Sequence, residues 1–263
     1  TLRQRGHTVM EPDSGLLACG AVGPGRLPEI ERIIQVVDTV HTHTEQDLRG
    51  RRVVIAGGPT REYLDPVRFL SNPSSGKTAI ALAHEAVSRG ATVTLVMGPG
   101  AVPHVKQGID RIDVVSADDM HQAVIRLAID ADIIIMSAAV SDWTPLVQSD
   151  HKLKKVGTTQ ALDMIRTTDI LADLGSHPAR SSFTLVGFAA ETEHVLDNAR
   201  DKCVRKNADL IIANDVSDPT IGFGSDDNTI MIVTPTTQQC VPRADKSTLA
   251  GVIFDAIVQG QAA

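Results

Sequence analysis

The residues with the clearest capacity for chemistry lie between positions 65 and 78. Ser74, Ser75 and Gly76 stand at the start of a helical pattern, and Lys77 follows them. The first backbone N–H groups of a helix lack partners within the helix, so such an end binds phosphate, and a lysine adds positive charge. The stretch predicts a phosphate-binding site. A loop with an ordinary serine helix cap explains the same residues and stays open as an alternative.

A P-loop is a second interpretation of the same stretch, because Gly76-Lys77-Thr78 completes the end of that motif. Ser71 stands where the motif has its first glycine, and a long segment separates the loop from the strand predicted at Val53–Ala56. A P-loop follows its strand directly. The sequence therefore disfavours this interpretation.

A second chemical stretch, Ser137-Ala-Ala-Val-Ser-Asp142, follows a strongly apolar strand. Ala138 and Ala139 would let a flat ring approach the backbone, whose polar groups could contact the edge of a base. Asp142 could hold a divalent cation. Close packing of strand and helix, with Asp142 as a helix cap, is the competing explanation.

Two basic segments could meet a phosphorylated ligand. The run His151-Lys-Leu-Lys-Lys155 lies in a polar stretch and suits either a lid over a polyphosphate or a solvated face. Lys202 and Lys206 are four residues apart, which places them on one helix face. A general basic surface would look the same.

Composition limits the class of protein. The chain has 263 residues, 42% hydrophobic residues and a net charge of −7, which fits a sizeable core and argues against nucleic acid as the main partner. Its three cysteines form neither a disulfide framework nor a zinc pattern, and no membrane-length apolar run is present, so we expect a cytoplasmic location. His41 and His43 have no third ligand nearby. From its start at Thr1 without methionine, we expect the sequence to be a fragment.

Strand-like and helical patterns alternate from Arg51 onward, which predicts an α/β fold with a mostly parallel sheet and a last strand running antiparallel at an edge. The expected strands are Val53–Ala56, Thr92–Met97, Ile112–Val115, Asp132–Ala138, Thr184–Phe188, Leu210–Asn214 and Thr229–Val233. The expected helices span 76–89, 117–130, 192–207 and 247–259. Ligands of such sheets bind beyond the carboxyl ends of the strands.

Taken together, these stretches resemble phosphopantothenate–cysteine ligase, the synthetase half of a bifunctional coenzyme A biosynthesis protein. The segments that carry the resemblance are Ala56-Gly-Gly-Pro-Thr-Arg-Glu62, Asp65-Pro-Val-Arg-Phe-Leu-Ser-Asn-Pro-Ser-Ser-Gly-Lys77, Ser137-Ala-Ala-Val-Ser-Asp142, Lys152-Leu-Lys-Lys155, Val186-Gly-Phe-Ala-Ala-Glu-Thr192, Arg205-Lys-Asn-Ala-Asp209, Ala213-Asn-Asp-Val-Ser217 and Gly222-Phe-Gly-Ser-Asp-Asp-Asn228. The resemblance implies a Rossmann-like three-layer sandwich with a doubly wound sheet over 51–263.

Residues 1–37 resemble the C-terminal end of the partner decarboxylase domain, and 38–50 resemble a linker. The resemblance places the decarboxylase proton donor at Cys19 and FMN only in the absent part of that domain. We expect Cys19 to be idle without that part.

The resemblance also implies a CTP-dependent ligation of 4′-phosphopantothenate and L-cysteine through an acyl-cytidylate, with Mg²⁺, in a homodimer that becomes a higher oligomer with the flavin domain. Asn72 and Lys152 would be catalytic, and Asp142 would hold the metal. The implied CTP-binding residues are Ala138, Ala139, Asp142, Lys152, Thr168, Asp169, Ile170, Leu171, Phe188, Lys202 and Lys206. The implied phosphate or substrate contacts are Gly58, Ser74, Ser75, Gly76 and Lys77.

Four positions depart from the family pattern: Thr167-Thr168 replaces Asn-Pro, Thr78 replaces an apolar residue, and Trp143 replaces Tyr or Phe. A nicotinamide- or flavin-binding oxidoreductase is the competing enzyme class, but no G-x-G-x-x-G follows the first strand. A non-catalytic nucleotide-binding module or a flavodoxin-like carrier is the third hypothesis.

Overall fold

The computed structural model describes residues 10, 12–16, 22–30, 32–34, 46–100, 105, 107–154, 157–191, 193–215 and 225–261. The chain forms two compact units, Thr1–Gln46 and Asp47–Ala263. In the first unit, β1 (Asp13–Leu16) pairs antiparallel with β2 (Val22–Arg26), and residues 30 and 32–34 are helical. Cys19, His41 and His43 lie outside the described residues. The predicted boundaries at 37 and 50 stay predictions.

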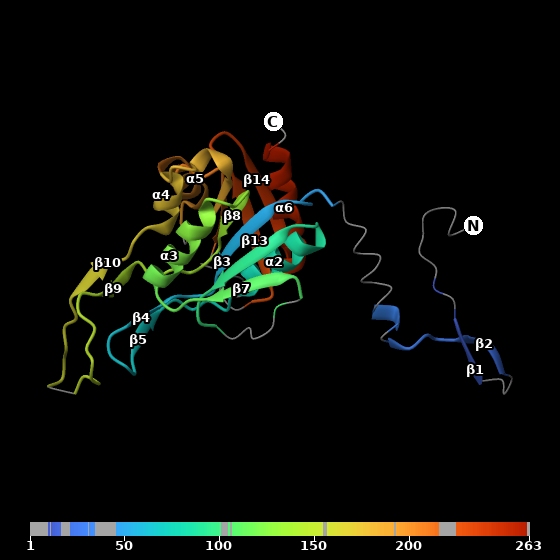
Figure 1. Ribbon diagram of the computed structural model, residues 1–263, viewed down its shortest axis with the longest axis horizontal. Helices are drawn as coiled ribbons and strands as arrows, with labels where there is room; N and C mark the ends of the chain where they lie inside the picture. Colours follow the sequence, from blue (N-terminus) through green and yellow to red (C-terminus); the bar gives the residue numbers. More distant parts are fainter. Residues whose placement is uncertain are drawn as a thin grey trace. The chain divides into compact units, whose positions relative to one another are not determined.

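An eight-stranded sheet forms the centre of the second unit, in the order β14-β13-β12-β11-β8-β3-β6-β7 (Figure 1). Its strands are β3 (Arg52–Gly57), β6 (Thr92–Met97), β7 (Ile109–Asp113), β8 (Ile133–Met136), β11 (Thr184–Glu191), β12 (Leu210–Asp215), β13 (Asp227–Val233) and β14 (Gln238–Asp245). The six strands from β12 to β7 run parallel, and β13 and β14 are antiparallel to their neighbours. The predicted α/β fold is confirmed, although the edge strand is β14, which the sequence analysis missed.

Helices cover both faces of this sheet. On one face α2 (Lys77–Ser88) and α6 (Lys246–Gln261) pack against side chains that include Val53 and Ile55. On the other face α3 (Ala117–Ala128), α4 (Ile170–Gly175) and α5 (Val195–Arg205) pack against side chains that include Val54 and Ala56. Alternate residues of β3 thus enter opposite cores, which is why the parallel strands are apolar on both faces.

The start of α2 is fixed by two glycines. Gly76 is the N-cap and has φ +75°, a conformation that glycine adopts without strain. At Gly57, the last residue of β3, an added Cβ would lie 2.1 Å from the Cβ of Ala79. Glycine therefore allows the first turn of α2 to lie directly against the carboxyl end of β3.

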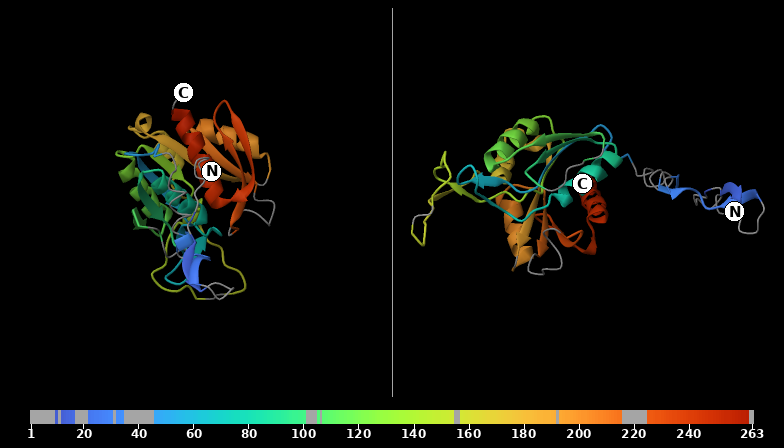
Figure 2. Two further views of the ribbon diagram at one scale, coloured as in Figure 1. Left: turned by 90° about the vertical axis from the view of Figure 1, so that its right-hand side faces the viewer. Right: turned by 90° about the horizontal axis from the view of Figure 1, so that it is seen from below.

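Two short hairpins leave this sheet. β4 (Arg61–Tyr63) pairs with β5 (Phe69–Ser71), and β9 (Trp143–Pro145) pairs with β10 (Met164–Arg166). The segment between β9 and β10 extends away from the sheet (Figure 2). The β4–β5 hairpin occupies the chain between β3 and α2, so the direct strand-to-helix loop of a P-loop does not exist here.

The buried carboxylate of Asp65 joins the two hairpins. It accepts hydrogen bonds from the backbone N–H groups of Val67, Arg68 and Leu153 and from the Arg68 guanidinium, which also donates to the Leu153 carbonyl at 2.7 Å. Burial alone would raise the pKa of Asp65, but these hydrogen bonds, led by that from Arg68, hold it well below its usual range. Among the described residues, no helix is long and apolar enough to cross a membrane.

Candidate functional site

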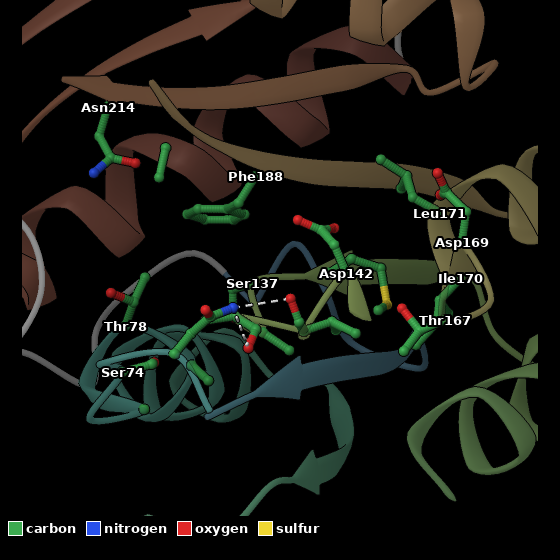
Figure 3. A pocket seen from close by; sticks show the side chains of 18 of the residues that line it. Ser74, Thr78, Ser137, Asp142, Thr167, Asp169, Ile170, Leu171, Phe188 and Asn214 are labelled. Carbon is green, nitrogen blue, oxygen red and sulfur yellow. Dashed lines mark hydrogen bonds between the residues drawn. The ribbon is translucent and has the colours of Figure 1, made fainter. Parts of the chain in front are cut away.

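A cavity of about 700 Å³ opens at the carboxyl ends of β8, β11 and β12, beside the start of α2 (Figure 3). Its lining from α2 and the preceding loop is Asn72, Ser74, Ser75, Gly76, Lys77, Thr78 and Ala79. The loop after β8 and the β9–β10 hairpin contribute Met136, Ser137, Ala138, Ala139, Val140, Asp142, Trp143, Arg166 and Thr167. The other lining residues are Thr168, Asp169, Ile170, Leu171, Phe188, Ala190, Lys202, Lys206, Asn214, Asn228 and Lys246. Most of these residues sit beyond strand ends, where the α/β pattern places ligands.

The structure brings together most residues that the sequence analysis assigned to a site. Those that line the cavity are Asn72, Ser74, Ser75, Gly76, Lys77, Ala138, Ala139, Asp142, Thr168, Asp169, Ile170, Leu171, Phe188, Lys202 and Lys206. Lys152 and Gly58 do not line it. Cys19 lies outside the described residues. The roles assigned to these side chains stay predictions.

The loop after β8 is fastened to the β3 side of the sheet by its backbone. The Ser137 N–H and hydroxyl both donate to the carbonyl of Ala56, at 2.9 and 2.8 Å. The Ala139 N–H donates to the carbonyl of Gly58 at 2.9 Å. Gly58 thus supports the cavity wall from outside. Because Ala138 and Ala139 have small side chains, a flat ligand group can approach this wall closely.

Asn72 is tied to the same wall. Its side-chain nitrogen donates to the carbonyls of Ala139 and Val140, at 3.3 and 3.0 Å. An amide has no proton to exchange near neutral pH. In this geometry Asn72 can orient the wall or bind a ligand, and it cannot act as an acid or base.

Among the described residues, five cationic and two acidic side chains line the cavity, in a chain whose net charge is −7. Four of these five cations, the lysines, have a carboxylate or carbonyl partner. Lys77 pairs with Asp226 at 2.6 Å, Lys206 pairs with Asp169, Lys202 donates to the carbonyl of Phe188 at 2.8 Å, and Lys246 donates to that of Ser225. The local excess of positive charge suits an anionic ligand.

Burial affects the titration of three of these groups. The pKa values of Lys202 and Lys246 are lowered, chiefly because burial disfavours their charged forms. Burial of Asp169 works in the opposite direction and would raise the pKa of its carboxyl. Hydrogen bonds from Lys206 and from the backbone N–H of Ala172 outweigh that effect and lower the pKa of Asp169 overall. Asp169 therefore stays ionised while it caps α4.

Asp142 is exposed at the cavity. Within the described part of the chain, no group of three or more His, Cys, Asp or Glu side chains is arranged to hold a metal. A cation at Asp142 would need its remaining ligands from water or substrate.

Lys152 lies in the segment between β9 and β10. The Ser149 N–H donates to the carbonyl of Leu64 at 3.0 Å, and the Leu153 N–H donates to the Asp65 carboxylate at 3.1 Å. These contacts hold the segment against the β4–β5 hairpin on both sides of Lys152. The expected lid over the cavity is therefore not formed by Lys152 in this arrangement.

Several lining residues were missed by the sequence analysis as site residues, namely Trp143, Arg166, Asn214, Asn228 and Lys246. Asn214 and Asn228 belong to segments that carry the resemblance, but they were not assigned to the site. Arg166 ends a strand that is too short to show a periodic pattern, and Lys246 begins a helix predicted to start one residue later. The signal that could have found Lys246 is a lysine at a helix start beside the sheet.

The family model described as "DNA/pantothenate metabolism flavoprotein C-terminal domain" matches residues 48–261. The chain belongs to this family. It is 46% identical over 232 residues to the coenzyme A biosynthesis bifunctional protein CoaBC of Bacillus subtilis, covering 88% of this chain and 57% of that protein. It is 44% identical over 235 residues to a cysteine/cysteine sulfinic acid decarboxylase of an unknown prokaryotic organism, covering 88% of this chain and 65% of that protein.

A solved structure agrees with the fold. The C-terminal domain of a CoaBC protein matches with a TM-score of 0.69 and 36% identity, covering 82% of this chain and 97% of that one. The chain spans little more than half the length of the Bacillus subtilis relative.

These names correct the expectation drawn from the resemblance. The matched family is described as a flavoprotein C-terminal domain, one relative is named a decarboxylase, and none of these three matches is named a ligase. The assignment to the CTP-dependent ligase half is therefore replaced by membership of the flavoprotein C-terminal domain family. The expected binding of CTP and Mg²⁺ rested on that assignment and is withdrawn with it. The link to coenzyme A biosynthesis is still supported by the matched relatives. The confinement of FMN to an absent domain is corrected as well, because the family is described as a flavoprotein.

FMN combines a flat ring with a phosphate, so a site for it needs an open wall for the ring and positive charge for the phosphate. Ala138 and Ala139 leave one wall open to a ring, Phe188 supplies an aromatic face, and Lys77 and Lys246 supply positive charge. These residues fit a phosphorylated planar group, a class that includes FMN and other nucleotides alike. Of the described cysteines, Cys203 is buried and Cys240 is exposed, and neither lines the cavity.

Proposed function

We propose that the chain acts in coenzyme A biosynthesis and that its cavity binds a phosphorylated derivative of pantothenate. The observation that carries the proposal is the cationic cavity at the start of α2, in a chain of negative net charge. Membership of a pantothenate-metabolism family and identity to a coenzyme A biosynthesis protein support it.

The phosphate of this ligand binds at the start of α2. Gly76, the N-cap, has no side chain that could accept a hydrogen bond from the first turn of the helix. The backbone N–H of Ile80 donates to the carbonyl of Gly76, which is the first hydrogen bond of the helical pattern. The N–H groups of the first turn are therefore available to an anion. Lys77 and Lys246 line the cavity beside them.

Calorimetry with 4′-phosphopantothenoylcysteine and its dephosphorylated form tests this function. Both ligands share the pantothenate chain, so the difference in affinity isolates the phosphate. We expect the dephosphorylated form to bind at least about tenfold more weakly, which is the effect of losing a charge-assisted hydrogen bond. Lys77→Gln should reduce the difference, whereas Lys154→Gln, on an exposed residue outside the cavity, should not. Equal affinity of the wild-type chain for the two ligands would refute the proposal.

The class of reaction is tested separately. The decarboxylase relative motivates an assay of CO₂ release from 4′-phosphopantothenoylcysteine with added FMN. Release of CO₂ would assign decarboxylation to this chain. Loss of that release in a Cys19→Ser variant would show that Cys19 is not idle. Binding without release would assign this cavity a binding role within a longer protein.

A further inference from the structure

We infer that Arg166, supported by the ring of Trp143, binds a carboxylate of the ligand at the end of the cavity opposite α2. This inference rests on the proposed function, which supplies the phosphorylated pantothenate derivative. It assigns the second anionic end of that ligand to a residue that the resemblance did not place in the site.

The cavity has two ends. Figure 3 shows Ser74 and Thr78 of the α2 end and Asp169 and Ile170 of the α4 end on opposite sides of Phe188. Arg166 lines the cavity and directly precedes Thr167, which lies beside Ile170 at the α4 end (Figure 3). A ligand with a phosphate at the α2 end therefore extends toward Arg166.

Arg166 differs from the other cations that line the cavity. The four lysines each have a carboxylate or carbonyl partner. Within the described residues, the Arg166 guanidinium has a contact with an aromatic ring and no recorded ion pair. Its hydrogen-bond donors are thus available to a ligand without breaking an existing pair.

Trp143 gives this guanidinium a fixed support. Arg166 and Trp143 are cross-strand partners in the β9–β10 ribbon, and the guanidinium carbon lies 5.7 Å from the centre of the indole ring. Arginine stacks on aromatic faces while its N–H groups remain free at the edge of its plane. The support costs Arg166 none of its donors.

A carboxylate is the group that this arrangement favours. A planar guanidinium binds a carboxylate through two parallel hydrogen bonds, a match of shape as well as charge. Two acidic side chains at this end repel a bound carboxylate only weakly. Asp169 is paired with Lys206, and Asp142 is exposed to solvent. Derivatives of pantothenate that retain a carboxylate carry it far from their phosphate, which matches the two ends of the cavity.

The test compares 4′-phosphopantothenoylcysteine with 4′-phosphopantetheine, which has the same chain and phosphate but no carboxylate. Trp143 is the only tryptophan of the chain, so its fluorescence reports binding at this end directly. We expect the wild type to bind the carboxylate ligand roughly tenfold or more tightly than 4′-phosphopantetheine. Arg166→Gln should remove that preference by weakening only the carboxylate ligand, and Arg166→Lys should restore part of it.

Arg61→Gln is the matched control, because Arg61 stacks on Phe69 at 4.5 Å and does not line the cavity. It should leave the preference unchanged. An Arg166→Gln variant that keeps the preference, or that weakens both ligands equally, would overturn the inference while leaving the proposed function intact. A wild type that binds neither ligand would overturn both.

Discussion

Asn72 and Val140 are joined by a hydrogen bond of 3.0 Å from the side-chain nitrogen to the main-chain oxygen. This bond links the loop before α2 to the loop after β8, across the wall of the cavity. The two loops come from segments far apart in the sequence. Their relative position therefore depends on a donor that only an amide, and not a carboxylate, supplies at Asn72.

Asn72→Asp should separate the two loops without unfolding the chain. The new carboxylate cannot donate, and it would face the carbonyl oxygens of Ala139 and Val140. We expect a loss of about 1 kcal/mol in the free energy of unfolding, typical of one hydrogen bond, and about tenfold weaker binding of the phosphorylated ligand. Calorimetry and thermal melts measure both. Unchanged affinity in both Asn72→Asp and Asn72→Ala would rule out a role for Asn72 in shaping the cavity.

Gly57→Ala should destabilise the fold at the start of α2. The new Cβ would lie 2.1 Å from the Cβ of Ala79, so the helix must move away from β3. We expect a cost of about 1–3 kcal/mol in the free energy of unfolding, as for overpacking. Gly251→Ala, in α6, is the contrasting change, because its Cβ would have only an ordinary contact at 3.8 Å, with Oε1 of Glu85. There we expect a gain of about 0.5–1 kcal/mol from higher helix propensity. Denaturant titration of both variants checks the two signs.

Arg89→Ala should be among the most destabilising single changes in the second unit. Its buried side chain pairs with Asp47, donates to Asp255 at 2.7 Å and lies over the Phe254 ring. Removal leaves the Asp47 carboxylate half-buried without its partner. We expect a loss of about 3–5 kcal/mol, as for breaking a buried ion pair.

Arg205→Ala is the control for this prediction, since its pair with Asp201 is exposed on α5. Such pairs contribute at most about 0.5 kcal/mol. Similar losses in the two variants, measured by urea denaturation, would show that the Arg89 network has no special weight.

Ligand affinity should fall as the pH rises above neutrality. The pKa of Lys202 is lowered, chiefly by burial, so its positive charge is lost at a lower pH than that of a free lysine. The ligand phosphate does not change charge there, because its second pKa is about 6. Lys202→Arg keeps its charge and should show a smaller decrease, with Lys246 as a remaining contributor. Binding curves for both proteins between neutral and alkaline pH should therefore diverge, and parallel curves would exclude Lys202 from the binding site.

The sequence predicted the parallel strands well where both faces are buried. The pattern from Thr92 to Met97 coincides with β6. The prediction was less accurate for β7, which was expected at Ile112–Val115 and lies at Ile109–Asp113. This edge strand is only partly buried and carries polar residues, so its apolar pattern is weak. The three-residue strands of the two hairpins are too short to show a period, which is why Arg166 and Trp143 were not placed together.

The site was predictable in position more than in chemistry. Strand ends mark where a ligand binds. The helix start at Ser74, Ser75 and Gly76 and the lysines four residues apart indicate that the ligand is anionic. They do not say which one, since the same arrangement serves many phosphorylated molecules. The role of Lys152 stays a prediction, and its side chain does not line the cavity. Its segment is held by Asp65, and a contact between residues so far apart in sequence leaves no local pattern.

A crystal structure of the chain with 4′-phosphopantothenoylcysteine tests the central claim most directly. Our account predicts density for the ligand inside the cavity, with its phosphate at the N–H groups that open α2 and its carboxylate beside Arg166. Density for the ligand at another surface, or in the cavity with its phosphate away from Lys77, would contradict the account.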